Sequence, residues 1–171
     1  MVDFEVVSLP ETHHVEVGET APDFTRPLVN GEYWENIALS DLTDEGPVLL
    51  GFHSMDGAFP ATYFWKEVKV RDWIDQVQVV GLSISDPYAH KQLLRKRSLV
   101  DEPVALFSDP ANEVAEAFGI VNHLDGMEGI EEPRPALYLL DGDREVQYVW
   151  VAQEWPDFPE YDEAEDAIER L

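Results

Sequence analysis

The chain has 171 residues, 44% of them hydrophobic, and its 36 acidic and 11 basic side chains give a formal net charge of -25. This length and apolar content predict one globular domain with a buried core, and the charge opposes binding to nucleic acid. The sequence contains no cysteine, which excludes disulfides, thiolate metal sites, thiol nucleophiles and dithiol redox chemistry.

The start of the chain and the distribution of charge bear on its location. No stretch of about 18 or more apolar residues is present, and residues 1–14 lack a basic flank before an apolar core. We therefore expect neither a membrane span nor a secretory signal, and a cytoplasmic protein. Acidic residues are spread between the apolar segments, which is typical of a surface kept hydrated in concentrated salt. The expected source is a halophilic microbe, in particular an archaeon.

The first half of the chain predicts a hairpin, a buried strand and a helix. Asn30-Gly31 separates two short runs and favours a type I′ turn, because both central residues of that turn need positive φ. The segment PVLLGFH, residues 47–53, is apolar almost throughout, as a central strand covered on both faces would be. A strand-to-helix corner follows and leads into a helix over roughly 63–76, where apolar residues recur at helical spacing.

The second half repeats one pattern of strand, aspartate cap, proline and helix, and then closes with a hairpin. An aspartate before a proline suits a helix start, because its carboxylate accepts a free backbone N–H and proline needs no donor there. Asp141-Gly142 marks the turn of the closing hairpin. The strands are residues 77–85 and 104–107, and the cap pairs are Asp86-Pro87 and Asp109-Pro110.

This order of elements fits an α/β sandwich of thioredoxin type, with a central mixed sheet flanked by helices. We expect the folded domain to span residues 15–158. Residues 1–14 are expected to be loosely ordered, and residues 159–171 to form an acidic C-terminal helix or tail.

Four segments in this order resemble the peroxiredoxins of the alkyl hydroperoxide reductase and thiol-specific antioxidant group, over about Val17 to Trp150. The resemblance implies a reaction in which a cysteine thiolate in the first turn of a helix attacks a peroxide and is then reduced by a second thiol. The helix N-terminus and an arginine from the closing hairpin lower the pKa of that thiol. The four segments are VGETAPDFTRPLVNGEYWENIALSDL, GLSISDPYAHKQLLRK, FSDPANEVAEAFGI and RPALYLLDGDREVQYVW.

The chain departs from the family pattern P-x-x-x-T/S-x-x-C around that cysteine. Counting forward from GFHS puts Ser54 at the proline, Ala58 at the hydroxyl residue and Ala61 at the cysteine. Counting back from the Arg-Asp pair farther along the helix puts Pro60 at the hydroxyl residue and Tyr63 at the cysteine. We favour Tyr63, because a helix holds its register while the preceding loop can absorb an insertion.

The family's arginine is displaced as well. Its register falls on Pro135, one place after Arg134, and a shift of one residue along a strand points the side chain to the opposite face. Arg134 would reach the corner only from a bulge. We therefore interpret the corner as the strand-to-helix structure of the resembled family without the residues of its thiol chemistry.

Two interpretations of this corner, which we call the remnant pocket, are open. We assign no catalytic residue. His53 and Asp56 could act as an acid–base pair beside Tyr63. In the simpler interpretation, which we favour, His53 lies at a strand end beside solvent, Asp56 caps a turn, and Tyr63 fills the old pocket. The remnant pocket comprises His53, Ser54, Asp56, Ala58, Phe59, Pro60, Ala61, Tyr63, Arg134 and Pro135.

No cofactor or metal is expected. His13 and His14 are adjacent rather than at ligand spacing, His90 and His123 lie in separate elements, and the carboxylates show no coordination pattern.

Two surfaces are candidates for partners, while a nucleic acid or a membrane is not expected. Four basic residues on one predicted helix could bind an acidic protein, or form a solvated face. Three aromatic residues near the corner could form a homodimer contact, as this neighbourhood does in the family that the chain resembles, or belong to the core. The basic residues are Lys91, Arg95, Lys96 and Arg97, and the aromatic residues are Phe59, Trp65 and Trp73.

Two classes of function follow. The first is a peroxiredoxin-like protein that has lost the peroxidatic cysteine and acts through binding or oligomerisation. The alternative is an enzyme that uses non-thiol chemistry in the remnant pocket. A third, weaker possibility is an antioxidant oxidoreductase by family membership only.

The net charge of -25 predicts a salt-dependent fold. Carboxylates crowded on one surface repel each other less when salt screens them, so the melting temperature should rise from low to molar salt. A thermal melt across a potassium chloride series measures this effect. A melting temperature that stays flat or falls with salt would contradict the salt-adapted interpretation.

Overall fold

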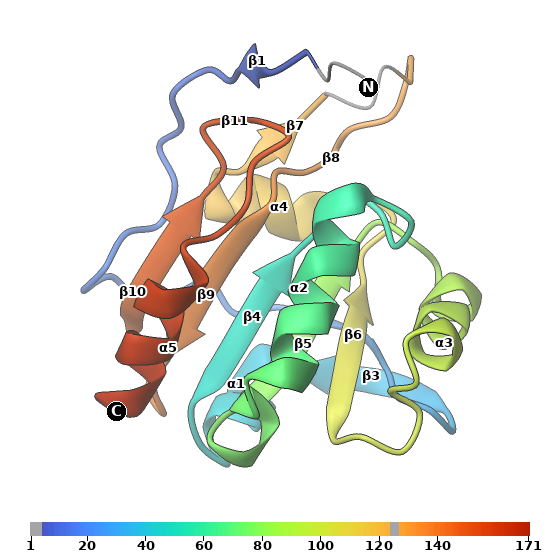
Figure 1. Ribbon diagram of the computed structural model, residues 1–171, viewed down its shortest axis with the longest axis vertical. Helices are drawn as coiled ribbons and strands as arrows, with labels where there is room; N and C mark the ends of the chain where they lie inside the picture. Colours follow the sequence, from blue (N-terminus) through green and yellow to red (C-terminus); the bar gives the residue numbers. More distant parts are fainter. Residues whose placement is uncertain (1–4, 124–126) are drawn as a thin grey trace.

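A mixed sheet of seven strands forms the centre of the computed structural model, which describes residues 5–123 and 127–171 (Figure 1). The strand order is β10-β9-β4-β5-β6-β2-β3. The central strands β4, β5 and β6 are parallel, and the outer strands pair antiparallel with their neighbours. The bounds are β2 (Thr25–Val29), β3 (Trp34–Ala38), β4 (Val48–Phe52), β5 (Gln78–Ser83), β6 (Val104–Ser108), β9 (Ala136–Leu140) and β10 (Val146–Val151).

Helices cover both faces of this sheet. The buried side chains of α2, α3 and α5 belong to one apolar cluster and those of α1 and α4 to another, so the sheet separates two cores. Figure 1 shows α2 crossing the central strands, with α3 on the β6 side and α5 beside β10. The expected α/β sandwich with a central mixed sheet is confirmed. The helices are α1 (Leu39–Thr43), α2 (Phe59–Val70), α3 (Pro87–Lys96), α4 (Glu113–Phe118), α5 (Tyr161–Glu169) and the 3-10 turn η1 (Trp73–Asp75).

Two short strand pairs lie outside the main sheet. β1 (Val7–Ser8) pairs with β11 (Glu154–Trp155), and β7 (Val121–Asn122) pairs with β8 (Glu132–Pro133). The described N-terminal residues therefore lie along the chain that follows β10. The C-terminal α5 packs on the sheet through one face, formed by Ala164, Ala167 and Ile168. The division into a domain over 15–158 and two terminal segments stays a prediction. Within residues 5–123 and 127–171, no helix combines the length and apolarity needed to cross a bilayer.

The helix after the corner differs from the predicted span 63–76. It begins earlier, at Phe59, because Pro60 fits the first turn, where its missing N–H would have no helical acceptor. It ends at Val70, since Asp72 adopts the left-handed backbone conformation (φ 55°) and starts the separate turn η1. The error at the start matters most, because it moves the first helical turn toward the corner.

The hairpin of β2 and β3 has a longer connection than a type I′ turn. Val29 pairs with Trp34, so the connection holds four residues, 30–33, and neither Asn30 nor Gly31 has positive φ. The Asn30 side chain instead accepts the backbone N–H groups of the two last residues of the connection, at 2.8 and 3.0 Å. Gly31 is needed for space, because a Cβ there would lie 2.4 Å from the carbonyl oxygen of Val100.

The two aspartate caps behave differently. Asp86 caps α3 as expected and accepts the backbone N–H of Ala89 at 2.8 Å. α4 begins only at Glu113, after a turn, so the expected start at Pro110 is wrong. Asp109 still accepts a backbone N–H of α4, that of Val114, at 2.8 Å, and its other oxygen pairs with Arg26 at 2.9 Å.

A pair of glycines sets how closely α2 approaches the sheet. Gly51 of β4 and Gly81 of β5 are register partners, so together they leave a flat area on one face of the sheet. A Cβ at Gly51 would lie 2.8 Å from the Phe64 ring, and a Cβ at Gly81 would lie 2.7 Å from the Trp65 ring. Both rings of α2 therefore rest on backbone, which brings the start of α2 directly over the end of β4.

Candidate functional site

The corner between β4 and α2 is the candidate site, and its first helical turn carries no reactive group. Ala58 is the N-cap and makes no side-chain hydrogen bond, and Phe59, Pro60 and Ala61 form the first turn. The free backbone N–H groups and the positive end of the helix dipole lie in this turn. Ala61 is fully buried there, whereas Tyr63 lies in the next turn. The helix start thus favours Ala61 over Tyr63 as the position of the family's cysteine, an assignment that stays a prediction.

Tyr63 does not fill a pocket, contrary to our simpler interpretation. Its side chain is 40% exposed, and its ring packs edge-on against Phe59 at 5.0 Å and Phe158 at 5.2 Å between centroids. Phe59 is itself 53% exposed. The helix start explains the error, because it turns residue 63 outward and places the small Ala61 against the core. The corner therefore presents an aromatic cluster on its surface, formed by Phe59, Tyr63 and Phe158.

His53 is buried rather than at the edge of solvent. Its backbone N–H donates to Leu82 and continues the pairing of β4 with β5. Its ring lies 5.1 Å from that of Phe64 and 5.9 Å from that of Trp65, and its Nε2 contacts no acceptor or donor among the described residues. Burial lowers the pKa of His53 from 6.5 to about 4, and the nearby His90 adds to this effect while Asp56 opposes it. The imidazole is therefore neutral at neutral pH.

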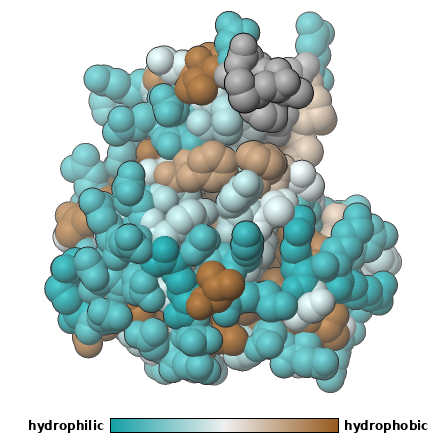
Figure 2. All heavy atoms as spheres, viewed as in Figure 1, coloured by the Kyte–Doolittle hydropathy of each residue, from teal (hydrophilic) through white to brown (hydrophobic). Residues whose placement is uncertain are grey.

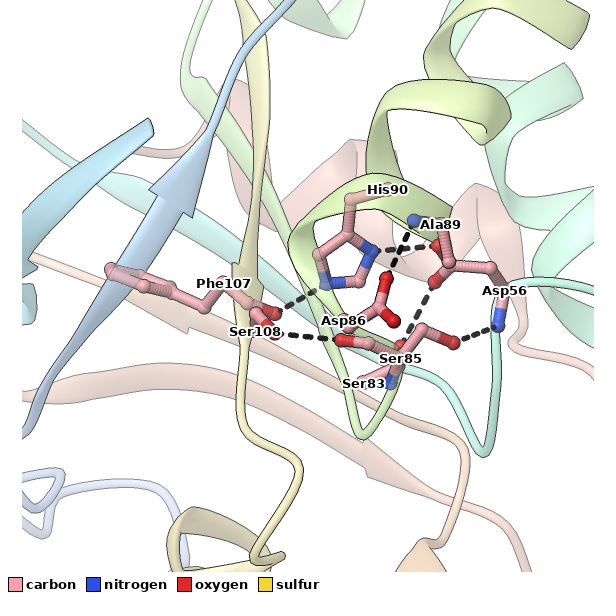
Figure 3. Close-up of polar contacts among 8 residues, drawn as sticks. All are labelled: Asp56, Ser83, Ser85, Asp86, Ala89, His90, Phe107 and Ser108. Carbon is pink, nitrogen blue, oxygen red and sulfur yellow. Dashed lines mark hydrogen bonds and ion pairs between the residues drawn. The ribbon is translucent and has the colours of Figure 1, made fainter. Parts of the chain in front are cut away.

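Asp56 pairs with His90 instead of His53 (Figure 3). Its Oδ2 lies 2.7 Å from Nδ1 of His90, and its Oδ1 accepts the hydroxyl of Ser83 at 2.9 Å. The second ring nitrogen of His90, Nε2, lies 2.9 Å from the carbonyl oxygen of Phe107. Both ring nitrogens of His90 thus face oxygen atoms, one of a carboxylate and one of a backbone carbonyl. The alternative interpretation, a pair of His53 with Asp56, is not what the described residues show, since the Asp56 carboxylate contacts His90 and Ser83.

Two further serines complete this network and join three elements. Ser85 accepts the backbone N–H of Asp56 at 3.1 Å, and Ser108 donates to the Ser85 carbonyl at 2.7 Å. Figure 3 shows the imidazole of α3 between the corner loop and the end of β6, with the serines below it. The network therefore ties the corner loop to the ends of β5 and β6 and to α3. A buried ion pair is tolerated when its remaining atoms are hydrogen-bonded, and this one satisfies that condition.

Sequence reasoning missed this partner, although one local signal was available. His90 lies four residues after the N-cap Asp86, on the face of α3 that buries Leu93 and Leu94. A histidine on an apolar helix face needs partners for two ring nitrogens, and the serines of the SISDP segment lie at the end of the preceding strand. Among the described residues, no group of three or more histidine and carboxylate side chains could hold a metal ion.

The closing strand brings no cation to the corner. Arg134 is buried, and its guanidinium donates to the carbonyls of Pro10 at 2.9 Å and Ala152 at 3.1 Å. Burial lowers its pKa from the usual range. These bonds tie the N-terminal segment to the chain just after β10, and they occupy the guanidinium of Arg134. Pro135 is also buried, and Ser54, buried next to His53, has no hydrogen-bond partner for its hydroxyl among the described residues.

The two predicted partner surfaces differ in the structure from what the sequence led us to expect. Trp65 and Trp73 are fully buried and belong to the core, which leaves Phe59 as the exposed member of the predicted aromatic group. The basic residues of α3 do not share one face. Lys91 donates to the Glu32 carbonyl at 2.8 Å beside β3, whereas Arg97, just after the helix, donates to Thr62 of α2 at 2.8 Å. The basic residues that could bind an acidic protein therefore contact two different neighbours, the connection before β3 and α2.

The low pKa of His53 predicts a defined loss of stability in acid. The unfolded state takes up the proton near pH 6.5 and the folded state only near pH 4, so stability is complete above pH 6.5 and falls as the pH falls through this window. His53→Gln removes the titration. Between pH 7 and pH 5, wild type should lose about 2 kcal/mol more unfolding free energy than this variant, measured by chemical denaturation.

The difference between the two proteins isolates His53, because every other titratable group is present in both. His13→Gln, at an exposed position, is the matched control and should follow wild type. Parallel pH profiles for wild type and His53→Gln would show that His53 is not held neutral by burial.

The chain is similar to known peroxiredoxins in both sequence and structure. The model of the AhpC/TSA family matches residues 17–149. The chloroplastic 2-cysteine peroxiredoxin of Chattonella marina var. antiqua is 28% identical over 145 residues, which cover 78% of this chain and 69% of that protein. The protein named peroxiredoxin bcp of Coxiella burnetii is 29% identical over 143 residues, which cover 80% of this chain and 88% of that protein.

Solved structures show the same fold. Mycobacterium tuberculosis AhpC superposes with a TM-score of 0.73 at 18% identity and covers 92% of this chain and 93% of its own. The reduced 2-Cys peroxiredoxin of Plasmodium vivax superposes with a TM-score of 0.71 at 22% identity. The match covers 90% of this chain and 80% of that protein. These likenesses establish a thioredoxin-like peroxiredoxin fold. Since the family match extends over most of its length, the chain belongs to the AhpC/TSA family as a member without any cysteine.

Proposed function

We propose that this protein is a peroxiredoxin-family member that does not reduce peroxides and acts through binding, as a homodimer. The observation that carries the proposal is the first turn of α2, where the family's thiolate is expected and where this chain has the buried Ala61. Thiol peroxidase chemistry requires a sulfur atom that is oxidised to a sulfenic acid and then reduced. The chain contains no such atom.

The surroundings of Ala61 support the proposal independently of the missing sulfur. A peroxidatic thiolate needs nearby positive charge to lower its pKa and to stabilise the leaving oxygen. The guanidinium of Arg134 donates to two backbone carbonyls, those of Pro10 and Ala152, and the neighbouring His53 is neutral. The site has therefore lost its supporting groups together with its nucleophile.

The alternative, an enzyme with non-thiol chemistry, receives less support from this geometry. His53 is buried among rings, Asp56 is bound to His90, and Tyr63 faces the surface. An acid–base mechanism needs the proton donor and acceptor within hydrogen-bond reach of one reacting molecule. These three side chains lie in three separate environments.

The proposal predicts that the purified protein does not consume hydrogen peroxide or organic hydroperoxides above a buffer blank, with dithiothreitol or thioredoxin supplied. The reason is the absence of a thiol. A cysteine-containing peroxiredoxin measured in the same assay serves as the positive control. Turnover that persists after metal chelation and repeated purification would overturn the proposal.

The aromatic cluster at the corner supports association into a homodimer. Phe59 and Tyr63 are exposed to 53% and 40%, next to the partly buried Phe158. Figure 2 shows apolar surface across the upper centre of this face, around the start of α2, bordered by hydrophilic surface. An apolar area with a polar border is typical of an interface between copies of a chain. A cytoplasm of high salt, which we also propose as the setting, would strengthen such an apolar contact.

We expect wild type to sediment as a dimer at micromolar concentration in molar potassium chloride. The double variant Phe59→Ser and Tyr63→Ser should sediment as a folded monomer, because it removes the two exposed rings. Tyr88→Ser is the control, since Tyr88 is 68% exposed but lies on α3 away from the corner. A monomeric wild type at about 100 μM, a concentration well above the dissociation constant of a stable dimer, would contradict the homodimer.

A further inference from the structure

A small pocket between α2 and the end of α3 gathers most of the lysines of this acidic protein. It has a volume of about 260 Å³ and is lined by Thr62, Trp65, Lys66, Lys69, Lys96 and Arg97, together with Ser98. The chain has 11 basic residues, and only four of these are lysines. Three of the four lysines line this one pocket. The lysines are therefore concentrated at one place instead of being spread over the protein surface.

The four cations of the pocket are not neutralised by the protein. Among residues 5–123 and 127–171, the ion pairs involve Arg26, Arg71, His90 and His123, and none involves a cation of the pocket. Glu67, the carboxylate nearest in sequence on α2, is bound to Arg71 at 2.6 Å. In a chain of net charge -25, carboxylates are abundant, yet these four cations, like Lys91 and Arg95 on α3, form no ion pair among the described residues.

Two hydrogen bonds hold the pocket in shape. Arg97 donates to the Thr62 hydroxyl at 2.8 Å across the two helices, and Lys69 donates to the Arg97 carbonyl at 3.2 Å. Trp65 forms part of the wall and is fully buried, and its indole N–H has no acceptor among the described residues. The walls therefore combine an arranged set of N–H and hydroxyl donors with one aromatic surface.

This combination identifies the chemical class of ligand. Four like charges around one small pocket repel each other, and a compact anion of two or more charges would remove that repulsion. Guanidinium, ammonium and hydroxyl groups that line one pocket suit the oxygens of a phosphate group. The volume exceeds that of a phosphate alone, which leaves room for a small organic group attached to the phosphate.

We propose that this pocket binds a phosphate-class anion, either inorganic phosphate or pyrophosphate, or the phosphate group of a small monoester. The proposal gives a ligand class to the binding role inferred above, but it depends on neither the missing thiol nor the dimer. The pocket is formed by the middle of α2 and the end of α3, whereas the corner residues lie at the start of α2. Peroxide consumption by the protein would therefore contradict only the proposed function. A lack of anion binding would contradict only the proposal for the pocket.

The experiment is a calorimetric titration of the full chain with sodium pyrophosphate and, separately, with inorganic phosphate and a phosphate monoester, phenyl phosphate. It is done in about 1 M potassium chloride, where the Debye length of about 3 Å suppresses repulsion by the remote carboxylates. Wild type should bind with saturation and one site per chain. Tighter binding of phenyl phosphate than of inorganic phosphate would identify the monoester as the better ligand, and the reverse would identify the free anion.

A pair of matched double variants locates the binding. Lys66→Gln with Lys96→Gln removes two charges from the pocket at exposed positions, and the dissociation constant should rise about 10-fold or more. Lys91→Gln with Arg95→Gln removes the same charge from α3 outside the pocket and should change the constant less than about 3-fold. Circular dichroism verifies that both variants are folded. The absence of saturable binding by wild type at millimolar anion, or an equal loss in both double variants, would overturn the proposal.

Discussion

The contact of α2 with two adjacent glycines of the sheet is the constraint on which the rest of this structure depends. Because Gly51 and Gly81 present only backbone, the rings of Phe64 and Trp65 can lie against β4 and β5. The same two rings surround His53 and account for its burial. Trp65 also contributes a wall to the basic pocket. Any side chain larger than glycine at either position would displace α2, and overpacking of this kind costs about 1–3 kcal/mol.

The Asp56 network is a second attachment of the same corner, and it differs in kind from the first. Packing of rings on backbone fixes the distance of α2 from the sheet, but it has no preferred direction along the strands. Hydrogen bonds from Asp56 to His90 and Ser83 have direction, so they fix where the corner loop lies relative to α3 and β5. The two attachments together leave the corner loop little freedom.

The sequence was sufficient for the strands of the main sheet, their order along the chain and the family, because each depends on local patterns that repeat along the chain. Buried strands are apolar without alternation, and the aspartate cap of α3 is visible in two adjacent residues, Asp86 and Pro87. The start of α2 could not be obtained in this way, since Ala58 offers no capping side chain. That one error carried over to Tyr63, which we expected inside a pocket and which lies on the surface.

Contacts between distant residues explain the remaining differences. Asp56 and His90 are separated by 34 residues, and at the level of sequence His53 is the nearer and more obvious partner for Asp56. The basic residues of α3 show the same difficulty, because four cations on one short helix suggest one face. Only the packing of α3 beside α2 reveals that Lys96 and Arg97 join Lys66 and Lys69, while Lys91 turns to β3.

The loss of thiol chemistry changes what the corner can contribute to the protein. A peroxidatic site must keep a charged thiolate and a cation partly desolvated, and such groups oppose folding unless they are fully paired. Here Ala61 and the neutral His53 are buried among apolar side chains, so this part of the corner contributes to the core. The uncompensated charge lies farther along α2, among the cations that face α3. Because uncompensated charge is costly to keep together, its position is the physical argument for placing the ligand of this protein beside Lys66 and Lys96 rather than at the inherited corner.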